Sequence, residues 1–532
     1  MSKDNEDSLF WVDQIAKKIV ERERKLKRSK TLRTEMGMGA SGIPHVGSAG
    51  DGIRAYVVNL ALKNTGAKSE FVAFTDDQDG LRKVPIGFPA VLEKEIGKPV
   101  SMIKDPYRCH KSLGEHITSL LSDSFDKLSV KFDLRRASVE YPKGTFDSEV
   151  VEILRKAKKA GEIIKKITGQ DKYLKQLPFM PICEKCGRIY TTTAYKFDAK
   201  TRKIRYRCDQ GFAGKNVNTG KNIVVKGCGH EGECGIREGK LAWKVEFAAR
   251  WRALQINYEA YGKDILDSVR CNDAVCKEIL GWDAPMHSFY ELFIERGGKK
   301  ISKSGGNVFT PDMWLSYASP ESMRLLFLKR LTTTRVVDLD AIPAYMDEAD
   351  DLEKIYFGKI GVENEKELAH LKRLHEYVHL FSPRESRVMI PYPMLINIMK
   401  IVKDKKSVRN TLERTGHVPA GLSKKDEEDL DMRLTYAENW VKDTGKEEVV
   451  PVRLNQKQKA ALKRLASNLR KKEWKEDELQ YAIHEIAKKT LGTREFFRVV
   501  YMALIQNERG PRLAPFILSI GRKKVAKLLE GL

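Results

Sequence analysis

The stretch that decides the fold is TLRTEMGMGASGIPHVGS, residues 31–48. Its first half reads as a strand, and its second half is a glycine-rich turn. A helical pattern follows, and EFVAF (70–74) then reads as a short buried strand that runs into the acidic residues Asp76, Asp77 and Asp79. Strand, glycine turn, helix and strand in this order open a doubly wound nucleotide-binding domain, so we predict an α/β fold of the Rossmann type.

The turn SGIPHVGS (41–48) has the chemistry of an anion site. A glycine turn places backbone N–H groups at the start of a helix, and Gly47 lets a nucleotide approach the backbone closely. His45 sits at the turn, where its ring can hydrogen-bond a phosphate oxygen. The alternative is an ordinary turn between a strand and a helix, with an incidental histidine.

A second glycine-flanked segment, GGKKISKSGGN, occupies residues 297–307 and contains no acid. The glycines permit motion, and Lys300 and Lys303 can neutralise a departing pyrophosphate. Because that charge appears only as the bond breaks, cations placed there stabilise the transition state selectively. The GxxxxGK[ST] spacing of a Walker loop is absent. The alternative is a solvated basic loop.

Composition bounds the class of protein. The chain has 532 residues, 41% hydrophobic and 32% charged, so it can build the cores of several domains. Lys and Arg number 97 against 73 Asp and Glu, a net charge of +24. This excess favours a polyanionic partner such as nucleic acid, and generic solubility or a thermophilic surface is the alternative. Without a membrane-length apolar run or a signal-peptide pattern, we expect a cytoplasmic protein that contacts no membrane.

The character of the sequence changes three times along the chain, which predicts four segments: 1–95, 96–240, 241–335 and 336–532. The second carries Cys and His clusters between basic, turn-rich stretches and looks like a metal-held insertion. The third returns to α/β character. The fourth is almost wholly helical: Leu462, Leu465 and Leu469 share one helix face, and Leu479, Ile483 and Ile486 share another. A helical segment of this length fits a helix-packed binding domain.

Two clusters have the residues of metal sites. Within DPYRCHKSLGEH, a carboxylate, a thiol and two imidazoles suit Zn²⁺, and the alternative is a polar helix start with a free thiol. The candidate ligands there are Asp105, Cys109, His110 and His116.

The other cluster begins with CEKC and reads as a zinc ribbon with long spacings. The favoured ligands are Cys183, Cys186, Cys208 and Cys228. His230 or Cys234 could substitute for one of them. Four protein ligands leave no open position for water, so the role would be structural. Cys271 and Cys276 lack partners at metal spacing and read as core thiols.

HVGS and KISKS, in this order and around an α/β pattern, resemble the paired HIGH and KMSKS signatures of class I aminoacyl-tRNA synthetases. Ser48 stands where that family often has His or Asn, and Ile301 replaces Met. Further segments look like the class I lysyl-tRNA synthetases of archaea and some bacteria: EMGMGASGIPHVGS, TDDQDGLRKVP, DPYRCHKSLGEH, PICEKCGRI with GCGHEG, KLAWKVEFAARW, YEAYGKD, KISKSGGN and GPRLAPFI. The resemblance covers nearly the whole chain and is most specific in the zinc region.

The resemblance implies roles for individual residues. The catalytic set would be His45, Gly47, Ser48, Lys300, Ser302 and Lys303. ATP would contact Gly42, His45, Gly47 and Lys303. The insertion 96–240 would meet the acceptor end of the tRNA. The helical segment 336–532 would be an anticodon-binding α-helix cage.

The lysine pocket implied by the resemblance needs carboxylates or aromatic faces around a substrate ammonium. Its candidate residues are Glu35, Gly37, Gly39, Trp243, Glu246 and Tyr290. Core packing is the alternative for each aromatic residue. Relatives often carry a histidine after GKD, where this chain has Ile265.

The implied reaction is ligation of lysine to tRNA. The lysine carboxylate attacks the α-phosphorus of ATP, pyrophosphate leaves, and a hydroxyl of the terminal adenosine of tRNA(Lys) takes the lysine. ATP, Mg²⁺ and two Zn²⁺ sites would be needed, and we expect a monomer. The competing hypotheses are a class I synthetase for glutamate or cysteine, and a non-catalytic zinc-containing RNA-binding protein.

Overall fold

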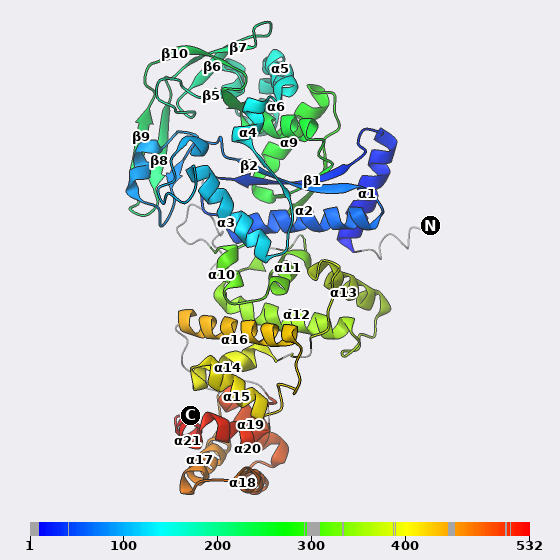
Figure 1. Cartoon of the computed structure of the whole chain (residues 1–532), viewed down its shortest axis with the longest axis vertical. Helices are drawn as coiled ribbons and strands as arrows, with labels where there is room; N and C mark the ends of the chain where they lie inside the picture. The colour runs from blue at the N-terminus through cyan, green and yellow to red at the C-terminus, as the bar shows by residue number, and fades with distance from the viewer. Residues whose placement is uncertain are drawn as a thin grey trace. The chain divides into compact units, whose positions relative to one another are not determined.

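The structure is a computed structural model that describes residues 10–40, 42–291, 293–294, 309–331, 333, 335–386, 388, 390–444, 453–505, 508–510 and 512–532. The chain divides into two compact units (Figure 1). Unit 1 comprises Met1–Asp312 with Leu326–Asp338, and unit 2 comprises Met313–Leu325 with Leu339–Leu532. Among the described residues, no helix is both long enough and apolar enough to cross a bilayer.

Unit 1 is built on a parallel sheet of five strands in the order β13–β12–β1–β2–β4. The strands are β1 (Leu32–Gly39), β2 (Ser69–Asp76), β4 (Asp133–Arg136), β12 (Tyr258–Gly262) and β13 (Met286–Tyr290). The chain leaves β1 toward β2 and β4 on one side and later fills the other side with β12 and β13. In such sheets ligands bind beside the carboxyl ends of the strands where this reversal occurs.

The two strands predicted from the sequence are β1 and β2, and both are confirmed. They pair in register from Leu32 opposite Ser69 to Gly39 opposite Asp76. Nearly every side chain of β2 is buried, as expected of a central parallel strand covered on both faces. The shared register brings the end of β1 and the end of β2 to one edge of the sheet.

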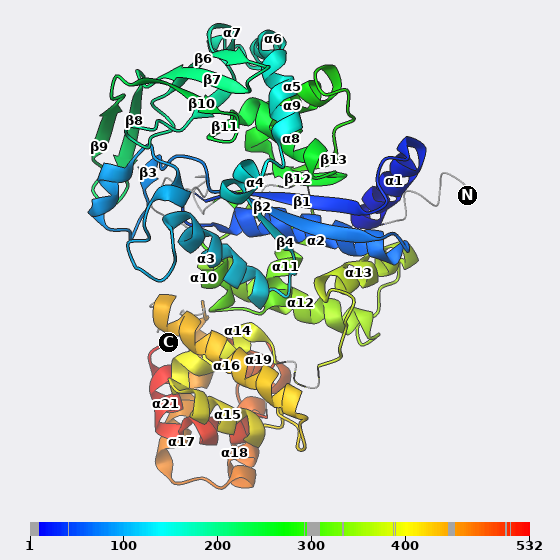
Figure 2. The ribbon, with the colours of Figure 1, turned by 45° about the horizontal axis from the view of Figure 1, so that its top comes forward.

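Helices cover both faces of the sheet (Figures 1 and 2). Helix α1 (Trp11–Leu26) packs on α2 (Val46–Asn64), and α2 packs on β1, β2 and β12. The other face carries α8 (Trp243–Ala253) and α9 (Leu266–Glu278), which pack against each other. Helix α2 starts directly after the glycine turn, so its N-terminus lies at the carboxyl edge of β1.

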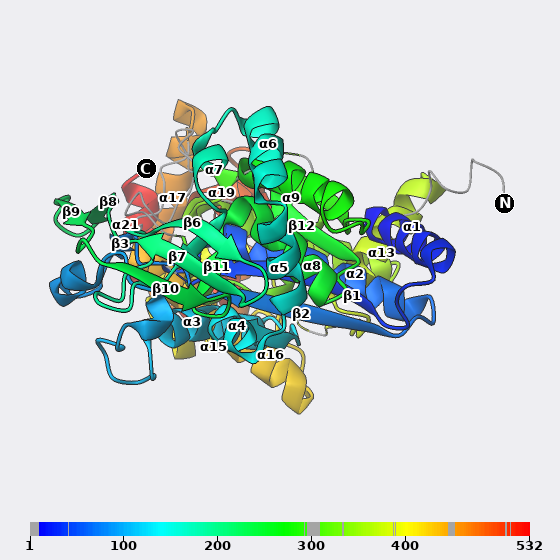
Figure 3. The same cartoon turned by 90° about the horizontal axis from the view of Figure 1, so that it is seen from above.

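The chain between β2 and α8 forms helices and small sheets, which are antiparallel except for the parallel pairing of β3 with β8. Its helices are α3 (Leu113–Lys127), α4 (Ala137–Lys143), α5 (Asp147–Arg155), α6 (Ala157–Thr168) and α7 (Lys172–Lys175). One small sheet contains β6 (Thr193–Asp198), β7 (Lys203–Arg207) and β10 (Glu231–Gly235). A second contains β3 (Lys83–Val84), β8 (Gly211–Asn216) and β9 (Asn222–Lys226), beside the first in Figures 1 and 3. A short pair joins β5 (Phe179–Pro181) to β11 (Gly239–Leu241).

The expected insertion 96–240 is not entirely separate from the main fold. Strand β4, at Asp133–Arg136, lies inside that range and pairs with β2 as the edge strand of the main sheet. The physical reason is that β2 would otherwise present an unpaired parallel edge. Two further strands of unit 1, β14 (Phe293–Ile294) and β15 (Arg335–Val336), pair with each other.

Unit 2 is helical in its described residues, as the sequence predicted. Helices α10 (Pro311–Leu315) and α11 (Pro320–Leu328) lie where the chain passes between the units in sequence. The helices that follow are α12 (Ile342–Tyr356), α13 (Glu365–Val378), α14 (Tyr392–Val402), α15 (Lys405–Arg414), α16 (Lys424–Thr444), α17 (Gln456–Lys471), α18 (Glu476–Lys488), α19 (Thr493–Ile505), α20 (Leu513–Ile520) and α21 (Arg522–Glu530). The predicted core positions of α17 and α18 are buried: Leu462, Leu465, Leu469, Leu479, Ile483 and Ile486.

Candidate functional site

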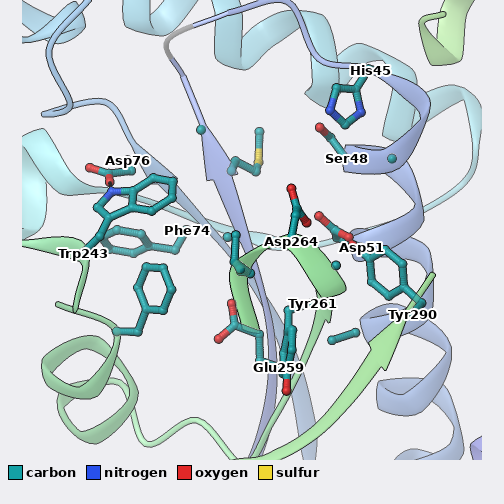
Figure 4. Close-up of a pocket in the computed structure, with 18 of the residues that line it drawn as sticks. His45, Ser48, Asp51, Phe74, Asp76, Trp243, Glu259, Tyr261, Asp264 and Tyr290 are labelled. Atoms are coloured by element: carbon teal, nitrogen blue, oxygen red, sulfur yellow. Dashed lines mark hydrogen bonds between the residues drawn. The ribbon is translucent and has the colours of Figure 1, made fainter. Parts of the chain in front are cut away.

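A cavity of about 340 Å³ opens at the carboxyl edge of the main sheet. Its walls come from the ends of β1, β2, β12 and β13, from the first turn of α2, and from α8 (Figure 4). It is lined by Gly37, Met38, Gly39, His45, Val46, Gly47, Ser48, Asp51, Phe74, Asp76, Trp243, Phe247, Arg250, Glu259, Ala260, Tyr261, Gly262, Asp264, Ile265 and Tyr290. The site therefore lies where a doubly wound sheet is expected to bind its ligand.

The predicted histidine motif forms one wall of the cavity. His45 is the N-cap residue of α2, and the backbone N–H of Ser48 donates to the carbonyl of His45 at 2.9 Å. A Cβ on Gly47 would lie 2.7 Å from Cε1 of His45, so only glycine leaves room for the imidazole in this position. The turn thus presents a ring and a helix N-terminus to the same cavity, and both attract phosphate oxygens. Gly42 is described but does not line the cavity.

The lysine-rich segment falls outside the described residues, and with it Lys300, Ser302 and Lys303. The described residues on either side of that segment lie at the site. Tyr290, at the end of β13, lines the cavity. On the far side, the carbonyl of Phe309 accepts a hydrogen bond of 2.8 Å from the N–H of Val46, the first residue of α2.

Two of the predicted aromatic residues face the cavity. Trp243 begins α8, and its Nε1 donates to Oδ2 of Asp76 over 2.8 Å. Figure 4 shows the Trp243 and Asp76 side chains together at one end, with His45 and Ser48 at the other. The ring of Tyr290 lies 4.0 Å from the guanidinium carbon of Arg54, a cation–π contact that fixes the ring.

Gly37 and Gly39, the glycines predicted for the lysine pocket, lie on β1. A Cβ on Gly37 would sit 3.6 Å from both Arg250 and Glu259, which form the floor of the cavity at this point. Gly37 and Gly39 both line the cavity. Without side chains there, a ligand can lie directly against the strand.

Glu35 and Glu246 do not line the cavity but lie buried behind it. Glu35 is ion-paired with Arg250, which also contacts Oε1 of Glu259 at 3.2 Å. Burial raises the pKa of Glu35 well above its usual range, although Arg250 opposes the shift. Burial also raises the pKa of Glu246, to about 8, and the neighbouring Asp76 adds to the effect. These two carboxyl groups therefore support the walls from within.

The sequence analysis did not assign several residues of the cavity. They are Asp51, Phe74, Phe247, Arg250, Glu259, Tyr261 and Asp264, together with Asp76. Asp76 had been noticed in the acidic run after β2, and three others lie in the segment YEAYGKD. For Phe74, Asp76, Glu259 and Tyr261 the available signal was their position near the carboxyl ends of parallel strands, since those ends converge on one edge. Asp51, Phe247 and Arg250 lie on helices α2 and α8. Ile265, where relatives often carry histidine, also lines the cavity.

Among the described residues that line the cavity, acidic side chains outnumber basic ones. They are Asp51, Asp76, Glu259 and Asp264, against the guanidinium of Arg250. Arg250 is itself engaged by Glu35 and Glu259. The cavity therefore suits a ligand with a cationic part and disfavours an anionic side chain.

The four favoured cysteines meet in one cluster. The sulfurs of Cys183 and Cys228 are 3.7 Å apart, as are those of Cys186 and Cys208. A tetrahedral site with Zn–S bonds of about 2.3 Å has S···S edges of about 3.8 Å, so the residues fit Zn²⁺. The backbone N–H of His230 lowers the pKa of Cys228 to about 7, which favours the thiolate that a metal requires.

The two alternative ligands are engaged elsewhere. Nε2 of His230 pairs with Oε1 of Glu184 at 2.6 Å. Cys234 is buried in β10, where burial raises the pKa of its thiol to about 12. Neither belongs to the four-sulfur cluster.

The second predicted cluster also comes together, around the thiol of Cys109. Its Sγ lies 3.2 Å from Oδ2 of Asp105, 3.1 Å from Nδ1 of His110 and 3.2 Å from Nδ1 of His116. Burial of Asp105 favours its protonated form, but hydrogen bonds from Cys109 and from backbone N–H groups outweigh it and lower the pKa of Asp105 to about 2. Mixed sulfur, nitrogen and oxygen donors at this spacing suit Zn²⁺.

The chain is similar in sequence to known tRNA synthetases. A family model described as tRNA synthetases class I (K) matches residues 9–380. A lysine–tRNA ligase of Cenarchaeum symbiosum (strain A) is 42% identical over 526 residues, 98% of each chain. A lysine–tRNA ligase of Pyrococcus horikoshii is 30% identical over 545 residues, 98% of this chain and 99% of the relative. Among solved structures, a glutamate tRNA ligase from Elizabethkingia meningosepticum aligns over 94% of this chain and 99% of its own, with 12% identity and a TM-score of 0.36.

Proposed function

The chain belongs to the family of class I tRNA synthetases, and from this premise we propose that it is a lysine–tRNA ligase. The observation that carries the proposal is the charge of the cavity. In the described part of the lining, four acidic side chains face one paired guanidinium at the carboxyl edge of the sheet. A cationic amino acid fits these walls, whereas the carboxylate side chain of glutamate would meet like charge.

We assign lysine to the part of the cavity between β1, β2 and α8. Gly37 and Gly39 allow the substrate to lie against β1, and Trp243 and Tyr290 supply aromatic walls. Glu35 and Glu246 act from behind these walls by holding Arg250 and the β2 end in position. Ile265 contributes an apolar contact at the position where relatives often carry a histidine.

We assign ATP to the first turn of α2. Gly42, Gly47 and Ser48 supply close backbone approach and a helix N-terminus for the phosphates, and His45 supplies a ring donor. Lys300, Ser302 and Lys303 would hold the triphosphate and the departing pyrophosphate. The support for their place is the position of Tyr290 and Phe309, which flank the segment and both contact the site.

In the reaction we propose, an oxygen of the lysine carboxylate attacks the α-phosphorus of ATP, and the bond to pyrophosphate breaks. The positive groups of the site stabilise charge that develops on the leaving phosphates, and bound Mg²⁺ would add to this charge stabilisation. A hydroxyl of the terminal adenosine of tRNA(Lys) then attacks the lysyl carbonyl, and AMP leaves. No residue of the chain needs to act as a nucleophile.

We further propose that two Zn²⁺ ions are structural. Cys183, Cys186, Cys208 and Cys228 would hold one of them. Asp105, Cys109, His110 and His116 would hold the other. Both lie in the segment that we assign to the acceptor end of the tRNA. We also propose that the working form is a monomer and that it acts in the cytoplasm.

A groove in unit 2 supports the assignment of residues 336–532 to the tRNA. It has a volume of about 710 Å³ and lies between α17 and α18. Its lining combines the basic residues Arg464, Lys471, Lys472 and Lys489 with Trp474 and Tyr481. The Tyr481 side chain is 72% exposed, so it is available to stack on an unpaired base.

The decisive experiment is ATP–pyrophosphate exchange with each of the twenty amino acids in turn. We expect exchange with lysine to exceed exchange with every other amino acid by several orders of magnitude. Exchange that depended on glutamate or cysteine would overturn the proposal, and exchange with none would favour a non-catalytic RNA-binding protein. Lysine attachment to tRNA then tests the second step.

A further inference from the structure

A lysine of the protein itself lies buried beside the substrate cavity. Lys240 belongs to β11, and its side chain has no exposed surface. Its ammonium is ion-paired with Oδ2 of Asp76, with Oδ1 of Asp79 at 2.9 Å and with Oε2 of Glu246 at 3.0 Å. Burying an ammonium costs several kcal/mol unless acids surround it, so this arrangement is built for an ammonium ion.

Asp76 connects this buried cluster to the cavity. Its Oδ2 accepts from Lys240 and also from Nε1 of Trp243 at 2.8 Å. Its Oδ1 is buried and has no hydrogen-bond partner in the part of the chain that the structure describes. Since Asp76 and Trp243 both line the cavity, Oδ2 of Asp76 links the buried ammonium of Lys240 to an aromatic wall of the site.

Three acidic side chains surround one ammonium in this cluster. Burial disfavours the charge of Lys240, but Asp76, Asp79 and Glu246 outweigh it and raise the pKa of its ammonium well above the usual range. The pKa of Glu246 is raised to about 8, and its Oε1 lies 3.0 Å from the hydroxyl of Tyr141, which can donate to it. The three acidic side chains therefore stabilise the ammonium of Lys240, and Asp76 is the member of the cluster that also lines the cavity.

We propose that Lys240 is a positioning residue for the amino-acid substrate. It fills the ammonium site between Asp76, Asp79 and Glu246, and so holds Asp76 against Nε1 of Trp243, which forms a wall of the substrate cavity. The proposal rests on the lysine ligase function proposed above.

The same arrangement excludes a wrong binding mode. Without Lys240, the three carboxyl groups would form a second, deeper site for an ammonium ion. A substrate lysine drawn into it would carry its carboxylate away from the α2 end of the cavity. Lys240 therefore restricts the substrate to the position from which its carboxylate can react.

The test is substitution Lys240→Ala in the full-length protein, followed by chemical rescue. In lysine-dependent ATP–pyrophosphate exchange we expect the KM for lysine to rise about tenfold or more, with the KM for ATP nearly unchanged. Added propylammonium, which replaces the deleted atoms, should restore the KM for lysine in a saturable way. Neither n-propanol, which lacks the charge, nor tetramethylammonium, which is too bulky, should do so.

Matched variants complete the design. Lys175→Ala removes a lysine of α7 whose side chain is 80% exposed, and it should leave every parameter unchanged. Lys240→Met keeps the side-chain volume without the charge, so it should raise the KM for lysine without any response to propylammonium. A folded Lys240→Ala protein with the KM of the wild type, or equal rescue by propanol, would overturn the inference.

If Lys240→Ala does not fold, Asp79→Asn provides a milder perturbation. Asp79 contacts Lys240 but does not line the cavity. We expect a rise of a few fold in the KM for lysine, and an unchanged KM would count against the inference. The two proposals fail separately, because wild-type protein inactive with lysine overturns the ligase, whereas active wild type with normal Lys240 variants overturns only the role of Lys240.

Discussion

At the scale of single residues, the site depends on positions where one atom more would change the geometry. Gly47 is the clearest case, because any side chain would meet the ring of His45 within 2.8 Å at two of its atoms. The sequence pointed to this glycine as a place of close nucleotide approach. The structure adds that it also sets the position of the histidine.

Substitution Gly47→Ala should displace His45 and lower the rate of lysine-dependent exchange by roughly 10- to 100-fold, the usual consequence of misplacing a group at an active site by about 1 Å. Steady-state exchange kinetics with ATP varied would measure it. The matched control is Gly361→Ala in unit 2, where a Cβ would meet nothing within 4 Å. Full activity of Gly47→Ala would remove His45 from the ATP site.

A buried histidine of unit 2 sets a pH dependence of stability. His375 on α13 is fully buried, with its ring stacked 4.2 Å from Tyr356 and 4.1 Å from His379. Its two ring nitrogens have no hydrogen-bond partner among the described residues. Burial and the neighbouring His379, against the opposing charge of Glu321, lower the pKa of His375 to about 3.

Because the unfolded chain binds a proton at His375 near pH 6.5 and the folded chain does not, the free energy of unfolding falls as the pH falls below that value. Between pH 7 and pH 5 this amounts to about 2 kcal/mol. His375→Phe should reduce the loss by about that amount in denaturant unfolding measured at both pH values. The control variant is His370→Phe, at an exposed position. An identical pH dependence in His375→Phe and wild type would contradict the assignment.

At the scale of elements, the small sheet of β6, β7 and β10 packs buried residues such as Ile204 and Tyr206 into the core of unit 1, and a cysteine cluster lies beside it. Cys183 and Cys186 precede β6, Cys208 directly follows β7, and Cys228 follows β9. The cluster therefore joins three separate chain segments. The sequence supplied the ligand types, but the long spacings left His230 and Cys234 as alternatives.

Zinc analysis of the purified protein should find about two equivalents per chain. Cys228→Ser and Cys109→Ser should each remove about one equivalent, and chelation should lower the melting temperature by several degrees, because structural metal binding contributes directly to folding. Cys234→Ala leaves both clusters intact, so its zinc content should equal that of the wild type. A loss of zinc from that variant would reopen the choice of ligands.

At the scale of the whole molecule, the acidic cavity and the basic groove belong to different units. The chain has a net charge of +24, yet the described lining of the cavity in unit 1 is mainly acidic. Part of the basic excess lies in the groove between α17 and α18. This separation fits two ligands of opposite character, a cationic amino acid and a polyanionic RNA.

Binding of tRNA should accordingly weaken steeply with salt, by roughly 10³-fold between 50 and 200 mM if about six phosphates are contacted. Lysine-dependent exchange without tRNA should change only a few fold over the same range, since its charges are buried and poorly screened. Filter binding and exchange assays on one preparation compare the two. Equal salt sensitivity would argue against a cation site shielded inside unit 1.

The sequence by itself determined the local order of elements, the ligand types and the family resemblance. Local patterns suffice for these, because a few residues are enough to recognise a glycine turn after a strand, a CxxC pair or a row of leucines on one helix face. It also placed His45, Gly47, Trp243 and Tyr290 among the candidates, and all four line the cavity.

Only the tertiary structure decided which charges meet. Asp76 and Lys240 lie 164 positions apart, and nothing in either segment indicates that they pair. Glu35 and Glu246 fall behind the cavity rather than in it, because β1 and α8 turn those side chains toward Arg250 and Lys240. The physical reason is that the energy of a buried charge depends on its neighbours in space. Those neighbours come from β2, β11 and α8, and they meet only when unit 1 folds.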